Sequence, residues 1–113
     1  MQLTDELRYK FLKALEANPN LSQRQISKEL GISLGKVNFC LNALLDVGWI
    51  KVCNFKKSQN KLGYAYLLTP KGMEEKIKIT RRFLNSKLQE YETLKVEISS
   101  LRLECSLFER IEN

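Results

Sequence analysis

Residues 30–50, LGISLGKVNFCLNALLDVGWI, constrain the fold more than any other stretch of this chain. Gly31 permits a tight turn after one helix, and Ser33 can cap the helix that follows. Apolar residues at helical spacing then predict one buried stripe, made of Val37, Leu41 and Leu44. Gly48 is expected to end this helix in a left-handed cap, and residues 49–52 are typical of a strand. The pattern predicts a helix-turn-helix that runs into a winged hairpin.

The same helix leaves an outward-facing set with the chemistry of DNA recognition. Its members are Leu34, Gly35, Lys36, Asn38, Phe39 and Asn42. The lysine and the asparagines can hydrogen-bond base edges or phosphates, and the phenylalanine can contact a thymine methyl group. The set contains no carboxylate, as expected of a helix that enters an anionic groove. An ordinary amphipathic helix with a solvated surface is the alternative, and the segments on both sides favour DNA recognition.

Two helices are expected upstream. The first covers residues 4–17 and ends at an Asn-Pro-Asn break, and the second begins at Ser22, where Gln25 completes a capping box. The predicted inner faces carry Leu7, Phe11, Ala14, Leu15, Ile26 and Leu30. Gln23 and Arg24 fall in the first turn of the second helix, where backbone amides favour a phosphate group. Solvated polar side chains are an equally weighted alternative for these two.

Two β-like runs, residues 49–55 and 64–69, predict the hairpin. The link between them has no acidic residue and holds three lysines: Lys56, Lys57 and Lys61. As the tip of a wing, these lysines would reach the DNA backbone or minor groove beside the site read by the preceding helix. A solvated charged tip without a DNA contact is the alternative.

A long helix is predicted from Pro70 onward, with Thr69 as its cap. Eight of its ten a and d heptad positions between Ile77 and Phe108 are apolar when Tyr and Cys are counted. The predicted dimerisation residues are Ile77, Leu84, Tyr91, Leu94, Ile98, Leu101, Cys105 and Phe108. A helix of about 63 Å is more than twice the width of a domain of about 70 residues. We therefore expect a homodimeric coiled coil, with a helix folded back on its own domain as the alternative.

Composition narrows the classes of function. The net charge is +6, and residues 1–69 carry ten Lys/Arg against five Asp/Glu, while residues 70–113 carry nine against eight. The excess charge therefore lies with the predicted helix-turn-helix and favours a nucleic-acid partner. Three distant cysteines and no histidine argue against a metal site, and a reducing cytoplasm suits them. We expect no cofactor, no membrane span, no signal peptide and no enzymatic activity.

From the second helix through Gly72, the chain resembles the MarR family of winged-helix regulators. The resemblance rests on GISLGKVNFCLNALLDVGWI and on the LTPKG that follows the second predicted strand. The small size, the segment RYKFLKALEANPNLSQRQISKEL and the single C-terminal helix resemble the subgroup associated with exopolysaccharide gene clusters. The resemblance implies a dimeric transcription factor that binds operator DNA through Ser33, Leu34, Gly35, Lys36, Asn38, Phe39 and Asn42, with a wing around residues 56–61.

The chain departs from the family pattern at two places. The usual wing carries an acidic residue and an arginine at its tip, whereas lysines occur here. Usual members also build their dimer from an N-terminal helix and paired C-terminal helices, with an effector crevice between them. This chain has one predicted C-terminal helix, so we do not extend a small-molecule sensor role to it.

These observations together predict a mostly α protein of the α+β class. Residues 1–69 would form a winged helix-turn-helix domain, and residues 70–113 a dimerisation helix. The predicted function is a cytoplasmic, homodimeric regulator of transcription that binds a palindromic double-stranded operator. The alternative is a winged-helix adaptor whose coiled coil recruits a protein partner.

Overall fold

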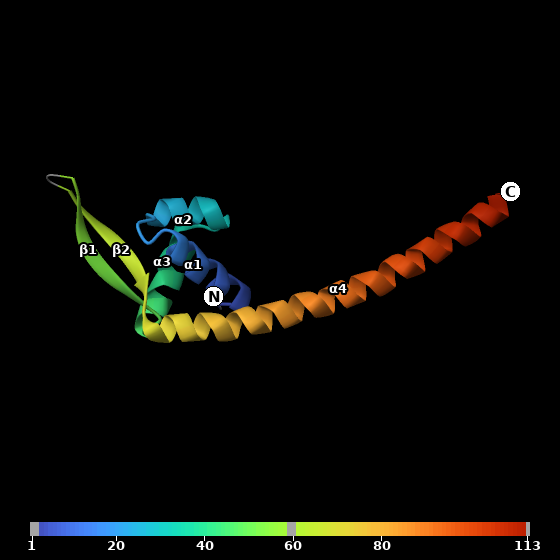
Figure 1. Ribbon diagram of the computed structural model, residues 1–113. Coiled ribbons are helices and arrows are strands. Elements are labelled where there is room, and N and C mark those ends of the chain that lie inside the picture. The colour runs from blue at the N-terminus through green and yellow to red at the C-terminus, as the bar shows by residue number, and fades with distance from the viewer. Residues whose placement is uncertain (1–2, 59–60, 113) are drawn as a thin grey trace. The chain divides into compact units, whose positions relative to one another are not determined.

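The computed structural model describes residues 3–58 and 61–112, except for the side chains of residues 54–58 and 61–64. The elements follow the order α1 (Asp5–Ala17), α2 (Gln23–Leu30), α3 (Leu34–Asp46), β1 (Ile50–Ser58), β2 (Lys61–Leu68) and α4 (Pro70–Glu112) (Figure 1). The chain forms two compact units, Met1–Arg81 and Arg82–Asn113. The first holds a winged helix-turn-helix and the beginning of α4, and the second holds the rest of α4. The predicted fold class is confirmed.

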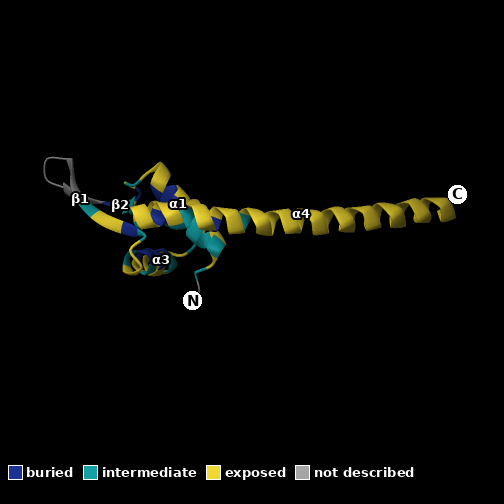
Figure 2. Cartoon of the chain, turned by 60° about the horizontal axis from the view of Figure 1, so that its bottom comes forward, coloured by how far each residue is buried: buried dark blue, intermediate teal, exposed yellow. Residues whose placement is uncertain are grey.

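The core of the first unit is built mainly from α1, α2 and α3. Its fully buried side chains are Phe11, Leu12, Leu15, Ile26, Val37, Cys40, Leu41, Leu44 and Ile79. The predicted stripe of α3 is confirmed, and Cys40 joins it from the intervening turn. On α1, Leu12 is buried as well, whereas Leu7 is half-buried at the edge of the cluster. Figure 2 shows buried residues on α1 and α3 in dark blue.

Local caps set where the three short helices begin. The Thr4 hydroxyl accepts a hydrogen bond from the backbone of α1 at 3.2 Å. Ser22 and Gln25 form the predicted capping box, with the Ser22 hydroxyl accepting at 3.1 Å and the Gln25 amide oxygen at 2.8 Å. Ser33 caps α3 in the same way, at 3.1 Å. Gly31 takes the left-handed conformation between α2 and α3, with φ of 68°. Each cap satisfies an amide that the helix cannot and sets where that helix begins.

The wing is a two-stranded antiparallel hairpin. Its register runs from Ile50 opposite Leu68 to Ser58 opposite Lys61, with an irregularity between Lys56 and Ser58. The Tyr66 amide donates to a carbonyl of the turn between α1 and α2 at 3.0 Å. This bond ties the base of the wing to the helical core.

The sequence placed the end of the first strand at residue 55 and the start of the second at residue 64, and both positions are wrong. Backbone pairing continues through much of the lysine-containing link, as far as Ser58 and Lys61. Lys, Asn and Gly have low strand propensity, so local composition indicated a loop there. The cross-strand ladder overrides that preference.

A compact junction links α3, the wing and α4 within the first unit. The Trp49 amide donates to the Leu44 carbonyl at 3.0 Å, and the Trp49 carbonyl accepts from the Thr69 amide at 3.0 Å. The Thr69 hydroxyl donates to the Gly48 carbonyl at 2.5 Å and accepts from the Gly72 amide at 3.0 Å. Thr69 is therefore the predicted N-cap of α4 and also the clamp that closes the hairpin.

The first turns of α4 belong to the winged unit. Ile79 is fully buried in its core, and Lys76 pairs with Glu16 of α1 at 2.8 Å. The compact unit therefore extends to Arg81, beyond Pro70, where the sequence placed the boundary. Ile79 lies off the a and d positions, so the heptad pattern does not reveal this contact.

Gly72 provides the first prediction. A Cβ atom at this position would lie 1.9 Å from the Trp49 carbonyl oxygen, so Gly72→Ala must force α4 away from the hairpin. We expect a loss of about 1–3 kcal/mol in the free energy of unfolding, measured by urea denaturation of the full chain.

The matched control is Gly35→Ala on α3, where an added Cβ meets nothing within 4 Å. This variant should keep the wild-type stability or gain up to about 1 kcal/mol. Equal stabilities of the two variants would contradict the close approach at Gly72.

Candidate nucleic-acid interface

The exposed face of α3 is the candidate interface. Gly35, Asn38, Phe39 and Asn42 are all exposed, opposite a stripe of α3 that is at most 1% exposed. Leu34 and Phe39 are 46% and 44% exposed. Lys36 is half-buried at the edge of this face. The structure thus brings the six outward-facing residues together on one side of one helix.

A chain of side-chain amides connects this face to α2. The Asn42 Nδ2 donates to Asn38 Oδ1 at 3.1 Å, and the Asn38 Nδ2 donates to Gln23 Oε1 at 3.5 Å. Both asparagines keep one N–H and acceptor capacity for a further partner. Side-chain amides present a donor and an acceptor side by side, which matches the major-groove edge of adenine. Gln23 is therefore tied to the asparagines of α3, a link that the sequence alone did not indicate.

Two further predicted residues, Ser33 and Arg24, have described side chains. Ser33 uses its hydroxyl as the cap of α3, so its role includes a structural one. Arg24 is exposed in the first turn of α2. The side chains of the predicted wing residues Lys56, Lys57 and Lys61 lie outside the described residues, although their backbones belong to β1 and β2.

Asp46 extends the outward face of α3 beyond the six predicted residues and adds a carboxylate to it. It is exposed in the last turn of α3 and follows Asn42 by four residues, so it continues the same face. The sequence reasoning stopped at Asn42 although the helix reaches Asp46. A carboxylate repels phosphates and can accept a hydrogen bond from the amino group of cytosine.

Cys40 lies on the opposite, buried side of α3. Burial raises the pKa of its thiol, and the nearby positive charge of Lys36 opposes part of that rise. A buried thiol with a raised pKa is a poor nucleophile and metal ligand. Cys40 therefore acts as a small apolar core residue.

Phe39 is held at one edge of the face. It borders a hollow of about 160 Å³ that Val47 and Trp49 also line. Arg8 lines the same hollow, and its guanidinium lies 5.8 Å from the centre of the Trp49 ring. The Phe39 ring therefore has apolar neighbours on one side and the polar face of α3 on the other.

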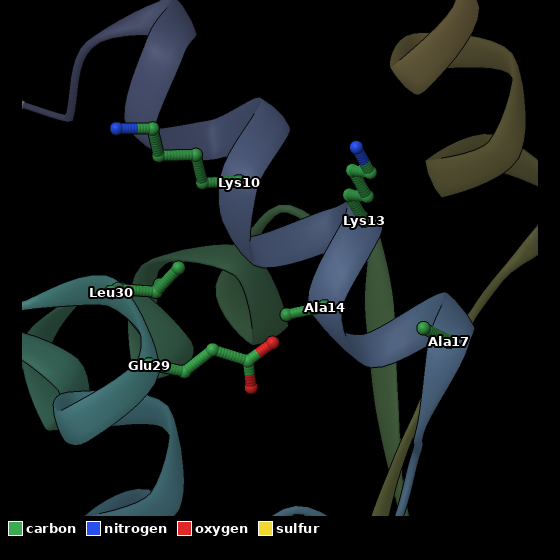
Figure 3. Close-up of a pocket in the computed structure, with 6 residues that line it drawn as sticks. All are labelled: Lys10, Lys13, Ala14, Ala17, Glu29 and Leu30. Atoms are coloured by element: carbon green, nitrogen blue, oxygen red, sulfur yellow. The ribbon is translucent and has the colours of Figure 1, made fainter.

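A larger hollow of about 340 Å³ lies between α1 and α2 (Figure 3). Lys10, Lys13 and Glu29 line it together with Ala14, Ala17 and Leu30. The two lysine side chains extend away from the Glu29 carboxylate in Figure 3, and Lys10 pairs with Glu6 at 3.4 Å. The charged groups do not converge on one ligand position.

The residues that the structure describes contain no cluster of three side chains suited to a metal ion. None of their helices has the length and apolar character needed to cross a membrane.

Comparison with known proteins agrees with this geometry. Residues 4–51 match the family described as winged helix-turn-helix DNA-binding. The first unit is a winged helix-turn-helix domain. A sequence comparison with curated proteins finds no match.

Two solved structures share the fold. A transcriptional regulator homologue from Pyrococcus horikoshii OT3 is 19% identical, with a TM-score of 0.56 over 74% of this chain and 83% of that one. FabT from Streptococcus pneumoniae, solved in complex with DNA, is 20% identical, with a TM-score of 0.55 over 98% of this chain and 78% of that one. At these identities the similarity establishes the fold alone.

Proposed function

We propose that this protein is a homodimeric transcriptional regulator that binds operator DNA through α3. The observation that carries the proposal is the exposed amide face of Asn38 and Asn42 on the second helix of a helix-turn-helix. The excess of positive charge in residues 1–69 supports an anionic partner. The similarity to FabT, which was solved with DNA, supports the same conclusion.

In this mechanism α3 enters the major groove and its asparagine amides hydrogen-bond base edges. Gln23 and Arg24 at the start of α2 contact a phosphate group on the groove edge. Lys56, Lys57 and Lys61 of the wing add phosphate contacts beside that site. The phosphate contacts supply affinity and register, and the contacts of α3 supply sequence specificity.

Membership of the MarR family and control of exopolysaccharide genes are the finer parts of the proposal. They rest on the pattern of residues 30–50, on the LTPKG segment and on the single long C-terminal helix. We place the protein in the cytoplasm, where its three free cysteines would stay reduced.

The proposed dimer forms through α4. The predicted dimerisation residues, from Ile77 to Phe108, form what we call the heptad seam. Their side chains are exposed in the single chain, and the exposed fractions of the large apolar ones are 39–61%. Such a stripe is stable in water only when a partner covers it. We propose a second copy of the chain as that partner. Two winged domains would then contact half-sites about 34 Å, or a multiple of that distance, apart on one face of the DNA.

Charges beside the seam favour a parallel pair. The g positions carry Glu90, Glu97 and Glu104, and the e positions carry Arg81, Lys95 and Arg102. In a parallel pair g faces the following e of the partner, so Glu90 faces Lys95 and Glu97 faces Arg102. At the two ends the pairs are like-charged, with Lys76 facing Arg81 and Glu104 facing Glu109. An antiparallel pair sets g against g and e against e, which is repulsive over most of the length.

An adaptor that recruits another protein is the second candidate function. It is favoured by a second apolar stripe on α4, outside the a and d positions: Val96, Leu103, Leu107 and Ile111, which are 49–81% exposed. Val96 and Leu103 occupy f positions and Leu107 a c position, away from the seam, whereas Ile111 occupies a g position beside it. A salt-dependent mobility shift with arbitrary duplex DNA supports the regulator, and the absence of any shift at low salt supports the adaptor.

The second prediction concerns base readout by the amides of α3. Asn38→Ala or Asn42→Ala should cost about 1–3 kcal/mol of binding to a duplex selected by the wild-type protein, with little loss on a scrambled duplex. Both side chains are exposed, so the free energy of unfolding should change little. Fluorescence anisotropy gives the affinities, with Asn85→Ala on α4 as the matched control. Wild-type affinity of both variants for the selected duplex would place recognition elsewhere.

The third prediction concerns the wing. Replacing Lys56, Lys57 and Lys61 with Gln removes three cations and should weaken binding to all duplexes alike. The slope of log affinity against log salt concentration should flatten by roughly 0.9 for each lysine that contacts a phosphate. An unchanged slope would show that the wing lies away from the DNA.

The fourth prediction concerns the orientation of the α4 pair. In a parallel dimer Cys105 lies at an a position opposite Cys105 of the partner subunit, so mild oxidation of a Cys53→Ser background should give a disulfide-linked dimer. Adding Cys105→Ser should abolish it. The variant Thr80→Cys tests the alternative, because full antiparallel overlap brings residue 80 to Cys105 of the partner subunit. A linkage between 80 and 105, without one between the two copies of 105, would contradict the parallel model.

A further inference from the structure

Gly35 is a glycine that the fold itself does not require. Gly31 and Gly48 have positive φ, and Gly72 lies against the backbone of Trp49. Gly35, in contrast, has an ordinary helical backbone in the first turn of α3, and an added Cβ would meet nothing within 4 Å. Glycine is less favourable than alanine in a helix, so alanine would fit this chain at least as well. Nothing in the described chain therefore requires glycine here, and a steric requirement would come from a partner.

The position of Gly35 indicates where that partner lies. It shares one face of α3 with Phe39 and Asn42, four and seven residues further on, and this face is opposite the buried stripe. Leu34 precedes it, and both Leu34 and Phe39 are close to half exposed. The missing side chain leaves open space at Gly35 on this face of α3, and Leu34 and Phe39 are the exposed apolar residues nearest to it along the helix. We call this position the notch.

We propose that this notch, formed by Leu34, Gly35 and Phe39, accepts the methyl group of a thymine in the major groove. The inference rests on the proposed binding of DNA by α3. The thymine methyl is the one apolar group that a base pair presents in the major groove. Gly35 offers no side-chain donor or acceptor, so the notch selects by shape and apolar contact. Asn38 and Asn42 read the neighbouring polar edges, and Gly35 lets α3 approach closely enough for them to do so.

The experiment adds one methyl group to the protein and removes one from the DNA. Wild-type and Gly35→Ala full-length proteins are titrated by fluorescence anisotropy against a duplex selected by the wild type and against a scrambled duplex. We expect Gly35→Ala to bind the selected duplex at least tenfold more weakly and the scrambled duplex within twofold of wild type. Its urea midpoint should equal or exceed that of wild type.

Substitution of deoxyuridine for each thymine in turn then locates the methyl group. At one position in each half-site the wild type should lose severalfold in affinity, while the deficit of Gly35→Ala should shrink at that same position. Asn42→Ala serves as the control, because its deficit should not shrink with any deoxyuridine.

The outcomes separate the inference from the function on which it rests. If the wild type binds no duplex at low salt, the proposed function fails. If the wild type binds specifically but Gly35→Ala binds equally well, or loses affinity equally on both duplexes, the notch is wrong. A wild type that tolerates every deoxyuridine within twofold would also overturn it, whatever the stability of the variant.

Discussion

The hydrogen bonds around Trp49 are the constraint on which the winged unit depends. The backbone of Gly48 and Trp49 is held by Leu44 at the end of α3 and by Thr69 at the start of α4. Gly72 lets α4 lie directly against this segment. One short stretch of backbone therefore joins the candidate recognition helix to the wing and to the first turns of the long helix. The orientation of all three elements within the unit follows from it.

Short-range hydrogen bonds build the candidate interface next to this junction. Caps at Ser22 and Ser33 set the start of α2 and α3, and the amide chain from Gln23 to Asn42 then joins their exposed surfaces. Charged groups are sparse on this face, with Lys36 at its edge and Asp46 in its last turn. A face made of amides and apolar groups favours readout of bases over general attraction to phosphates. In our proposal the general attraction comes from the wing and from α2.

Local patterns in the sequence predicted much of this fold, because caps and helical periodicity act over a few residues. The capping box at Ser22 and the stripe around Leu41 are examples of such signals. Contacts between distant segments were not predictable in the same way: Ile79 is buried by α4 packing on the winged unit, and the strands extend to Ser58 and Lys61 through cross-strand pairing. For the site, periodicity identified the exposed face but stopped short of Asp46, and it gave no indication that Gln23 contacts Asn38. The wing and dimer contacts stay predictions.

The central claim is that two copies of α3 read one DNA duplex. Hydroxyl-radical footprinting of the wild-type protein on its selected duplex, with the stoichiometry measured in parallel, tests this claim directly. The account predicts two chains per duplex and two protected segments on one face, separated by about 10 base pairs or a multiple of that spacing. One chain with a single protected segment, or no protection at low salt, would contradict it.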